Sequence, residues 1–94
     1  MIKYLENEED FEKEIAGDVI VDFYADWCGP CKMIGEILEE TDFNILKINV
    51  DDFQNLAVRF GVMSIPTLIK FSGGNEIKKV IGYRNKEELE EEFK

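Results

Sequence analysis

Two cysteines at close spacing are the side chains of this sequence best suited to do chemistry. Cys28 and Cys31 are the only cysteines, and the segment Trp27-Cys28-Gly29-Pro30-Cys31-Lys32 also holds the only tryptophan. Cysteines at this spacing can close a small disulfide ring. A Cys-x-x-Cys motif between a buried strand and a helix is typical of a redox-active pair. The spacing therefore indicates thiol–disulfide exchange.

The position of the motif predicts different roles for the two sulfurs. The thiolate is the nucleophile, and the partial positive charge and free N–H groups of a helix N-terminus favour it. Cys28 comes just before the predicted helix, and Cys31 lies in its first turn. We therefore predict that Cys28 is the exposed attacking cysteine and Cys31 the shielded resolving one. Gly29 permits the chain to turn tightly into the helix. Pro30 suits the first helical turn because a backbone N–H there would have no partner.

Two other uses of the cysteine pair remain open at this point. The pair could form an inert structural disulfide, or it could supply half of a zinc site. Structural zinc usually takes four Cys or His ligands. The chain has two cysteines and no histidine, so zinc would require carboxylates or a second chain.

An acidic residue interrupts the apolar segment 19–25 that precedes the motif. A buried carboxylate costs free energy unless it is paired, and burial raises its pKa. A raised pKa would suit Asp22 to accept the proton of Cys31. Lys47 lies on the next predicted strand and could face Asp22. The plain alternatives are a solvent-facing Asp22 and a surface Lys47.

The rest of the pattern alternates between strand and helix signals. Apolar, β-branched runs predict strands at 2–5, 19–25, 45–50, 67–71 and 76–81, and Ser72-Gly73-Gly74-Asn75 predicts a hairpin turn. Helix caps are expected at Asn7, at Asp51 or Asp52, and at Asn85 with Glu88 as a capping box. Gly17 is expected to end the first helix. The predicted class is α/β, in the order β-α-β-α-β-α-β-β-α, with a central mixed sheet and helices on both faces.

Length and composition restrict the class of protein. A chain of 94 residues, 45% hydrophobic and 34% charged, predicts one globular domain over 1–94, most simply a monomer. The net charge of −10 and the lack of clustered Lys and Arg argue against nucleic-acid binding. No apolar run reaches membrane-spanning length. The first residues turn acidic without the apolar core of a signal peptide, so we expect a cytoplasmic protein.

Several segments together resemble the thioredoxin family. The segment from Val21 to Ile34 is similar to the family's motif at nearly every position, and Gly61-Val62-Met63-Ser64-Ile65-Pro66-Thr67 is similar to its loop with a cis proline. Phe71 to Gly74 resembles its hairpin, and Ile81-Gly82 its final glycine. The resemblance covers essentially the whole chain.

This resemblance implies a protein-disulfide reductase, a thiol–disulfide oxidoreductase that needs no cofactor beyond its reversible disulfide. Its partners would be disulfide-containing target proteins and a thioredoxin reductase. Cys28 would attack and Cys31 resolve, with Asp22 as the family's buried acid and Lys47 as its basic neighbour. Gly29 and Pro30 match the pair that keeps the family strongly reducing. The implied docking residues are Trp27, Ser64, Ile65, Gly82 and a cis Pro66, with Ile65 binding an incoming chain like an added strand.

The sequence departs from the family pattern at four places. Tyr24 replaces a common tryptophan, and Gly35-Glu36 replaces a residue and proline that kink the second helix, so we expect a straighter helix. The segment from Glu39 to Ile45 is short, so this helix should end early. Tyr83 replaces a small residue beside the docking surface. Tyr83 and the short segment motivate one rival hypothesis, a dedicated electron donor to one enzyme. The short, acidic chain leaves a second one open, a non-catalytic binding module.

Overall fold

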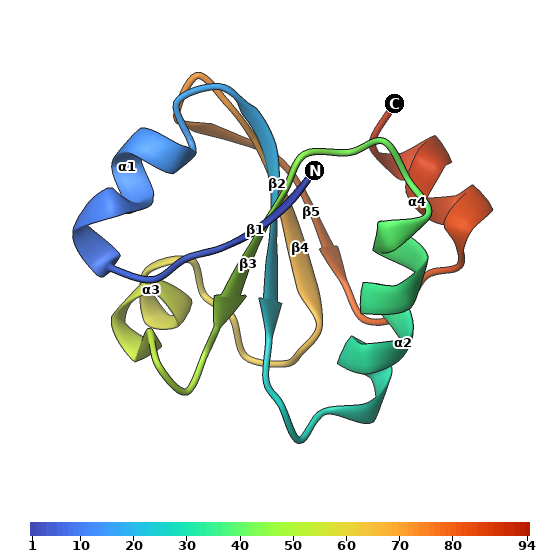
Figure 1. Ribbon diagram of the computed structural model, residues 1–94, viewed down its shortest axis with the longest axis horizontal. Coiled ribbons are helices and arrows are strands. Elements are labelled where there is room, and N and C mark those ends of the chain that lie inside the picture. The colour runs from blue at the N-terminus through green and yellow to red at the C-terminus, as the bar shows by residue number, and fades with distance from the viewer.

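Strands and helices alternate along the chain as predicted. The computed structural model describes residues 1–94 (Figure 1). Its elements are β1 (Ile2–Tyr4), the 3₁₀ helix η1 (Glu8–Asp10), α1 (Phe11–Glu14), β2 (Asp18–Tyr24), α2 (Gly29–Glu39), β3 (Ile45–Asn49), α3 (Gln54–Arg59), β4 (Thr67–Ser72), β5 (Asn75–Ile81) and α4 (Lys86–Glu92). The mixed α/β class and the element order are confirmed. No helix has both the length and the apolar character needed to cross a membrane.

The five strands form one sheet with β2 at its centre. The spatial order is β1-β3-β2-β4-β5. Strands β1, β3 and β2 run parallel, and β4 and β5 add an antiparallel hairpin. Because β2 has neighbours on both sides and helices above and below, its interior residues are buried. The chain therefore leaves the middle of the sheet when it enters the Cys-x-x-Cys segment.

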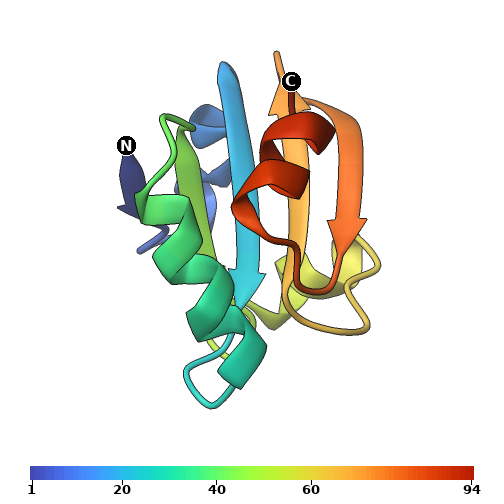
Figure 2. The same cartoon turned by 90° about the vertical axis from the view of Figure 1, so that its right-hand side faces the viewer.

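Helices cover both faces of the sheet, and the side-chain alternation of β2 divides the core between them. Figures 1 and 2 show α2 and α4 on one face and α1 and α3 on the other. Val21 and Phe23 pack in the core cluster on the α1 and α3 side. Ile20 packs with the buried residues of α2 and α4. Since side chains alternate along a strand, Asp22 points to the same face as Ile20, toward α2.

The C-terminal third of the chain folds through the predicted local signals. Gly73 and Gly74 have φ values of 58° and 84°, so the two-residue turn between β4 and β5 uses backbone angles that glycine readily adopts. The Asn85 side chain accepts the N–H of Glu88, and the Glu88 carboxylate accepts the N–H of Asn85. The predicted hairpin and capping box are therefore confirmed.

Some predicted helix boundaries are wrong. Asn7 precedes η1, but its side chain makes no capping hydrogen bond. Helix α1 ends at Glu14, before Gly17. Helix α3 follows Phe53, so neither Asp51 nor Asp52 caps it. The Asp51 carboxylate instead accepts a hydrogen bond from Trp27, a tertiary contact that local helix signals do not reveal.

Candidate active site

The cysteine pair lies where the chain turns from the end of β2 into the first turn of α2. Cys28 is the N-cap residue of α2, and its Sγ accepts a hydrogen bond from the backbone N–H of Cys31 at 3.2 Å. A disulfide joins the two residues, whose Cα atoms are 5.2 Å apart. The Sγ of Cys28 therefore lies at the positive end of the helix, where a thiolate is stabilised.

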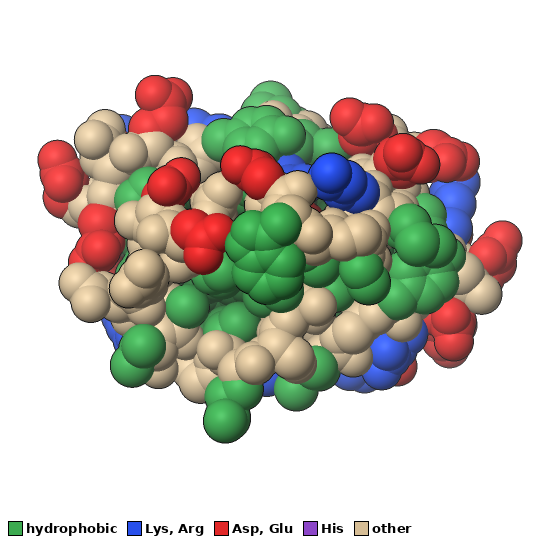
Figure 3. Space-filling model, turned by 90° about the horizontal axis from the view of Figure 1, so that it is seen from below, with side chains coloured by type: hydrophobic (Ala, Val, Ile, Leu, Met, Phe, Trp, Pro, Cys, Tyr) green, Lys and Arg blue, Asp and Glu red, His purple; other side chains and the backbone are tan.

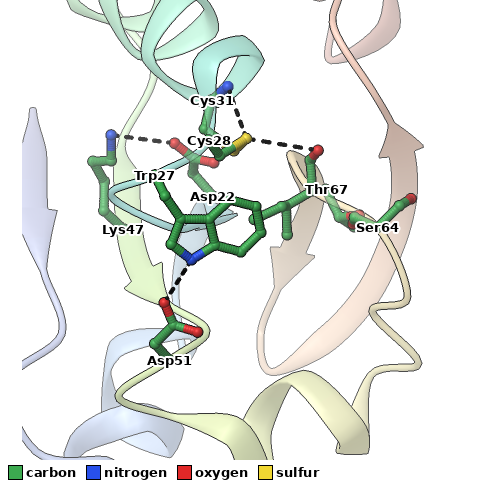
Figure 4. Close-up of a disulfide and its surroundings, with 9 residues drawn as sticks. Asp22, Trp27, Cys28, Cys31, Lys47, Asp51, Ser64 and Thr67 are labelled. Atoms are coloured by element: carbon green, nitrogen blue, oxygen red, sulfur yellow. Dashed lines mark hydrogen bonds and ion pairs between the residues drawn. A yellow bond between two sulfur atoms is a disulfide. The ribbon is translucent and has the colours of Figure 1, made fainter.

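The expectation that Cys28 is exposed is wrong for this oxidised state. Cys28 is 5% exposed and Cys31 is 2% exposed. Both pack in a small apolar cluster with Ala25, and Ile65 lies against it. The Sγ of Cys28 is 3.8 Å from the backbone carbonyl oxygen of Ile65 (Figure 4). The Cys-x-x-Cys motif does not predict that Cys28 is covered, because the covering residue, Ile65, lies in a loop distant in sequence.

Asp22 is completely buried beside the cysteine pair (Figure 4). Neither carboxylate oxygen accepts a hydrogen bond from the protein. Its one charged partner is Lys47, whose Nζ lies 3.5 Å from Oδ2. Burial raises the pKa of Asp22 to about 6, and the positive charge of Lys47 opposes that rise. The carboxyl group can therefore take up and release a proton just below neutral pH.

Lys47 reaches Asp22 because of the strand register. Asp22 of β2 pairs with Lys47 of β3 in the parallel ladder. Directly paired residues place their side chains on the same face of a sheet, here the face covered by α2. The side chain of Lys47 is only 12% exposed, so the alternative of a free surface lysine does not apply.

The loop before β4 lies next to the disulfide. Its Ile65–Pro66 peptide bond is cis. The hydroxyl of Thr67 donates to the carbonyl of Ser64 at 2.7 Å, and the N–H of Gly82 donates to the carbonyl of Pro66 at 2.8 Å. Gly82 has a φ of 91°, which favours glycine. The structure thus brings the predicted residues Ser64, Ile65, Pro66 and Gly82 together at one end of the sheet.

Trp27 lies on the surface of this end. It is 72% exposed, and its Nε1 donates to Oδ2 of Asp51 at 2.9 Å (Figure 4). Sequence reasoning missed Asp51 as a site residue. The available signal was the position of Asp51 just after β3. Parallel neighbouring strands end at the same edge of a sheet, so the residues that follow β3 and β2 lie close together.

Exposed apolar side chains lie at the end of the molecule that carries the cysteine pair. Figure 3 looks onto this end of the molecule and shows hydrophobic side chains across its middle, with acidic groups both beside them and at the rim. Trp27, Met33, Met63 and Tyr83 are 72%, 55%, 97% and 41% exposed. Apolar groups gathered in this way are typical of a surface that binds another protein. No group of three or more Cys, His, Asp or Glu side chains is arranged to hold a metal ion.

Comparisons with known proteins agree on one family. The thioredoxin family model matches residues 2–94. A thioredoxin from Alicyclobacillus acidocaldarius is 48% identical over 88 residues, which cover 85% of this chain and 84% of the relative. A thioredoxin from Staphylococcus saprophyticus is 48% identical over 91 residues, 89% of this chain and 88% of the relative.

Solved structures give the same result. A mutant thioredoxin from Halobacterium salinarum superposes with a TM-score of 0.89 at 34% identity, covering 98% of this chain and 87% of the other. Oxidised mitochondrial thioredoxin 3 from Saccharomyces cerevisiae gives a TM-score of 0.85 at 33% identity, covering 98% and 92%. With its Cys28–Cys31 disulfide at the start of α2, this chain belongs to the thioredoxin family of thiol–disulfide oxidoreductases.

Proposed function

We propose that this protein reduces disulfides of other proteins, with Cys28 as the attacking sulfur and Cys31 as the resolving sulfur. The observation that carries the proposal is the place of Cys28: its Sγ caps α2 and accepts the N–H of Cys31. That placement supports the thiolate needed for attack. Cys31 lies in the first turn of α2, where it is almost completely buried and is bonded to Cys28.

The reaction proceeds in two exchange steps. The Cys28 thiolate attacks one sulfur of a target disulfide, which forms a mixed disulfide and releases the other target sulfur as a thiolate. Cys31 then loses its proton to the Asp22 carboxylate, and the Cys31 thiolate attacks Sγ of Cys28. The second target thiolate leaves, and the Cys28–Cys31 disulfide remains. Two electrons pass to the target, and a thioredoxin reductase restores the dithiol.

Asp22 is the base in this scheme because it is buried, close to the cysteine pair, and mostly ionised at neutral pH. Asp22→Asn should slow resolution of the mixed disulfide by about a hundredfold while the first attack keeps its rate. The two steps can be separated by rapid mixing of the reduced protein with a protein disulfide, followed by acid quench. Asp18→Asn is the matched control, since it makes the same change at an exposed position of the same strand. Equal rates in Asp22→Asn and wild type across pH would make Asp22 a structural residue only.

Target proteins are proposed to dock over the apolar end of the molecule. Neither the N–H nor the carbonyl of Ile65 takes part in a backbone hydrogen bond, so Ile65 can pair with an extended target segment. Ser64, cis Pro66, Gly82 and Trp27 form the rest of this proposed docking surface. Gly29 and Pro30, between the cysteines, are proposed to tune the reduction potential.

Trp27→Ala should raise KM for a protein disulfide by about tenfold, because exposed aromatic anchors contribute strongly to protein association. Reduction of a small aromatic disulfide, which needs no docking surface, should change little. Ile77→Ala removes a side chain that is 58% exposed on β5 and serves as the control for loss of surface apolar area. An unchanged KM in Trp27→Ala would remove Trp27 from the docking surface.

The cellular setting forms part of the same proposal. We place a single domain over 1–94, acting as a cytoplasmic monomer on several disulfide-containing targets. The partly exposed Tyr83 beside Gly82 favours one rival: a dedicated electron donor to a single enzyme. A panel of unrelated protein disulfides separates the two, since similar rates across the panel support the general reductase and one strongly preferred substrate supports the dedicated donor.

A further inference from the structure

Lys47 is held by more than its ion pair with Asp22. Its Nζ lies 4.5 Å from the ring centre of Tyr24 and 5.8 Å from that of Tyr4. The two rings are in edge contact, with their centres 6.3 Å apart. An ammonium group over an aromatic ring is attracted to its π face, more strongly when water is excluded. The two tyrosines therefore take the place of water around a cation that is mostly buried.

Strand register explains how these side chains come together. Tyr4 of β1 pairs with Lys47, and Asp22 of β2 pairs with Lys47 on its other side. Tyr24 is two residues beyond Asp22 and so points to the same face of the sheet. The three parallel strands thus place an aromatic ring, the cation and the carboxylate in a row, with the second ring next along β2.

Helix α2 leaves space for the ammonium group at Gly35. A Cβ at this position would lie 3.2 Å from Nζ of Lys47, closer than ordinary van der Waals contact. Gly35 does not have a positive φ, so its backbone does not require glycine. Glycine within a helix is less favourable than alanine. The close approach of Lys47 is the physical reason that this structure offers for a glycine at an unfavourable place.

We propose that Tyr4, Tyr24 and Gly35 are positioning residues that hold the Lys47 ammonium beside Asp22 and so control when Asp22 accepts the proton of Cys31. This inference rests on the proposed role of Asp22 as the base. A cation held close favours the carboxylate, whereas a cation that can move away to water favours it less. Loosening Lys47 should therefore raise the pKa of Asp22 above its value of about 6.

Lys47 is the charged group that acts on Asp22 in the folded protein. On β4, the residue opposite Asp22 is the apolar Leu68. Helix α2 contributes Cys31, which is bonded to Cys28 in this state. A surface hollow of about 290 Å³ gives this region access to solvent, and its lining residues are Tyr24, Ala25, Asp26, Cys31, Lys32 and Lys47. The ammonium group therefore stands between the solvent and the buried carboxylate.

The test is the pKa of Asp22 in the oxidised protein, measured by carbon NMR of the carboxyl group. Tyr24→Leu should raise this pKa by about half a unit to one unit, because it removes the ring that holds Lys47. Tyr24→Phe keeps the ring and should leave the pKa unchanged. Gly35→Ala should also raise it, since the methyl group displaces the ammonium while alanine favours the helix and so keeps the fold intact.

Lys47→Met provides the control background. It should raise the pKa of Asp22 further than either variant, and adding Tyr24→Leu or Gly35→Ala to it should produce no extra shift. A pKa that stays at its wild-type value in both single variants, or a shift that persists without Lys47, would overturn the proposal. Such a shift would mean that the substitutions act on Asp22 through burial alone.

The pH profile of mixed-disulfide resolution separates this inference from the function it rests on. If both hold, the profile of Tyr24→Leu moves to higher pH by the same amount as the NMR pKa, and Tyr24→Phe restores it. If the NMR pKa of Asp22 moves but the pH profile of resolution does not, two claims fail. Lys47 and its neighbours would not control resolution, and Asp22 would not be the base. In that case the contact of the two tyrosines with Lys47 would have a structural role only.

Discussion

Cys28→Ser should reduce a protein disulfide at least about a thousandfold more slowly than the wild type, because a serine hydroxyl is not ionised at neutral pH and cannot form the mixed disulfide. The structure gives Cys28 two features that Cys31 lacks: the N-cap position of α2 and contact with the loop before β4. The measurement is the initial rate at which the pre-reduced protein opens the disulfide of a protein substrate.

Cys31→Ser is the matched control, since it removes the same sulfur atom three residues away. It should retain the first attack and lose turnover, because nothing releases the bound target. Loss of the first attack in both variants, with both proteins folded, would show that the two cysteines do not have separate roles. Retention of the first attack in Cys28→Ser would reverse the proposed assignment.

Asp22→Asn should stabilise the oxidised protein at pH 7 by up to about 3 kcal/mol. The pKa of Asp22 is about 6 in the folded protein, against an ordinary value of 3.8. Below pH 4 the folded chain holds the proton and the unfolded chain holds it in large part, so Asp22 has little effect on stability there. Between pH 4 and 6 the unfolded chain releases the proton first, and wild-type stability falls as pH rises. Each unit of pKa difference corresponds to about 1.4 kcal/mol.

Urea unfolding of wild type and Asp22→Asn at pH 4 and pH 7 checks this prediction. The free energies of unfolding should be similar at pH 4 and should differ in favour of the variant at pH 7. Asp18→Asn, at an exposed position of the same strand, should show no such pH-dependent difference. A variant that is less stable than wild type at pH 7 would mean that the ion pair with Lys47 outweighs the cost of burying the carboxylate.

The sequence predicts those parts of the site that depend on local patterns or on the alternation of side chains along a strand. The Cys-x-x-Cys segment falls between β2 and α2 because an apolar strand pattern precedes it and a helix pattern follows. Asp22 is buried because it lies inside that central strand, and Lys47 faces it because the two residues are paired on adjacent parallel strands. The capping box at Asn85 and the glycine turn before β5 are likewise local.

Other features depend on contacts between distant segments, and no local pattern contains them. Cys28 is covered by Ile65, which enters from the loop before β4. Asp51 looked like a helix cap because it precedes a helical run, but its carboxylate binds the indole of Trp27 instead. The close approach of Lys47 to Gly35 joins β3 to α2. In each case the partner lies on another element of the fold, so a local sequence pattern does not name it.

Trapping of the mixed-disulfide intermediate is the most direct test of thiol–disulfide exchange through Cys28. Pre-reduced Cys31→Ser would be mixed with a protein disulfide, quenched with acid and digested, and the joined peptides would be identified by mass spectrometry. A stable adduct through Cys28 is expected, with no adduct in Cys28→Ser. An adduct through neither cysteine, with the thiols free and the fold intact, would contradict thiol–disulfide exchange through this pair on general protein substrates.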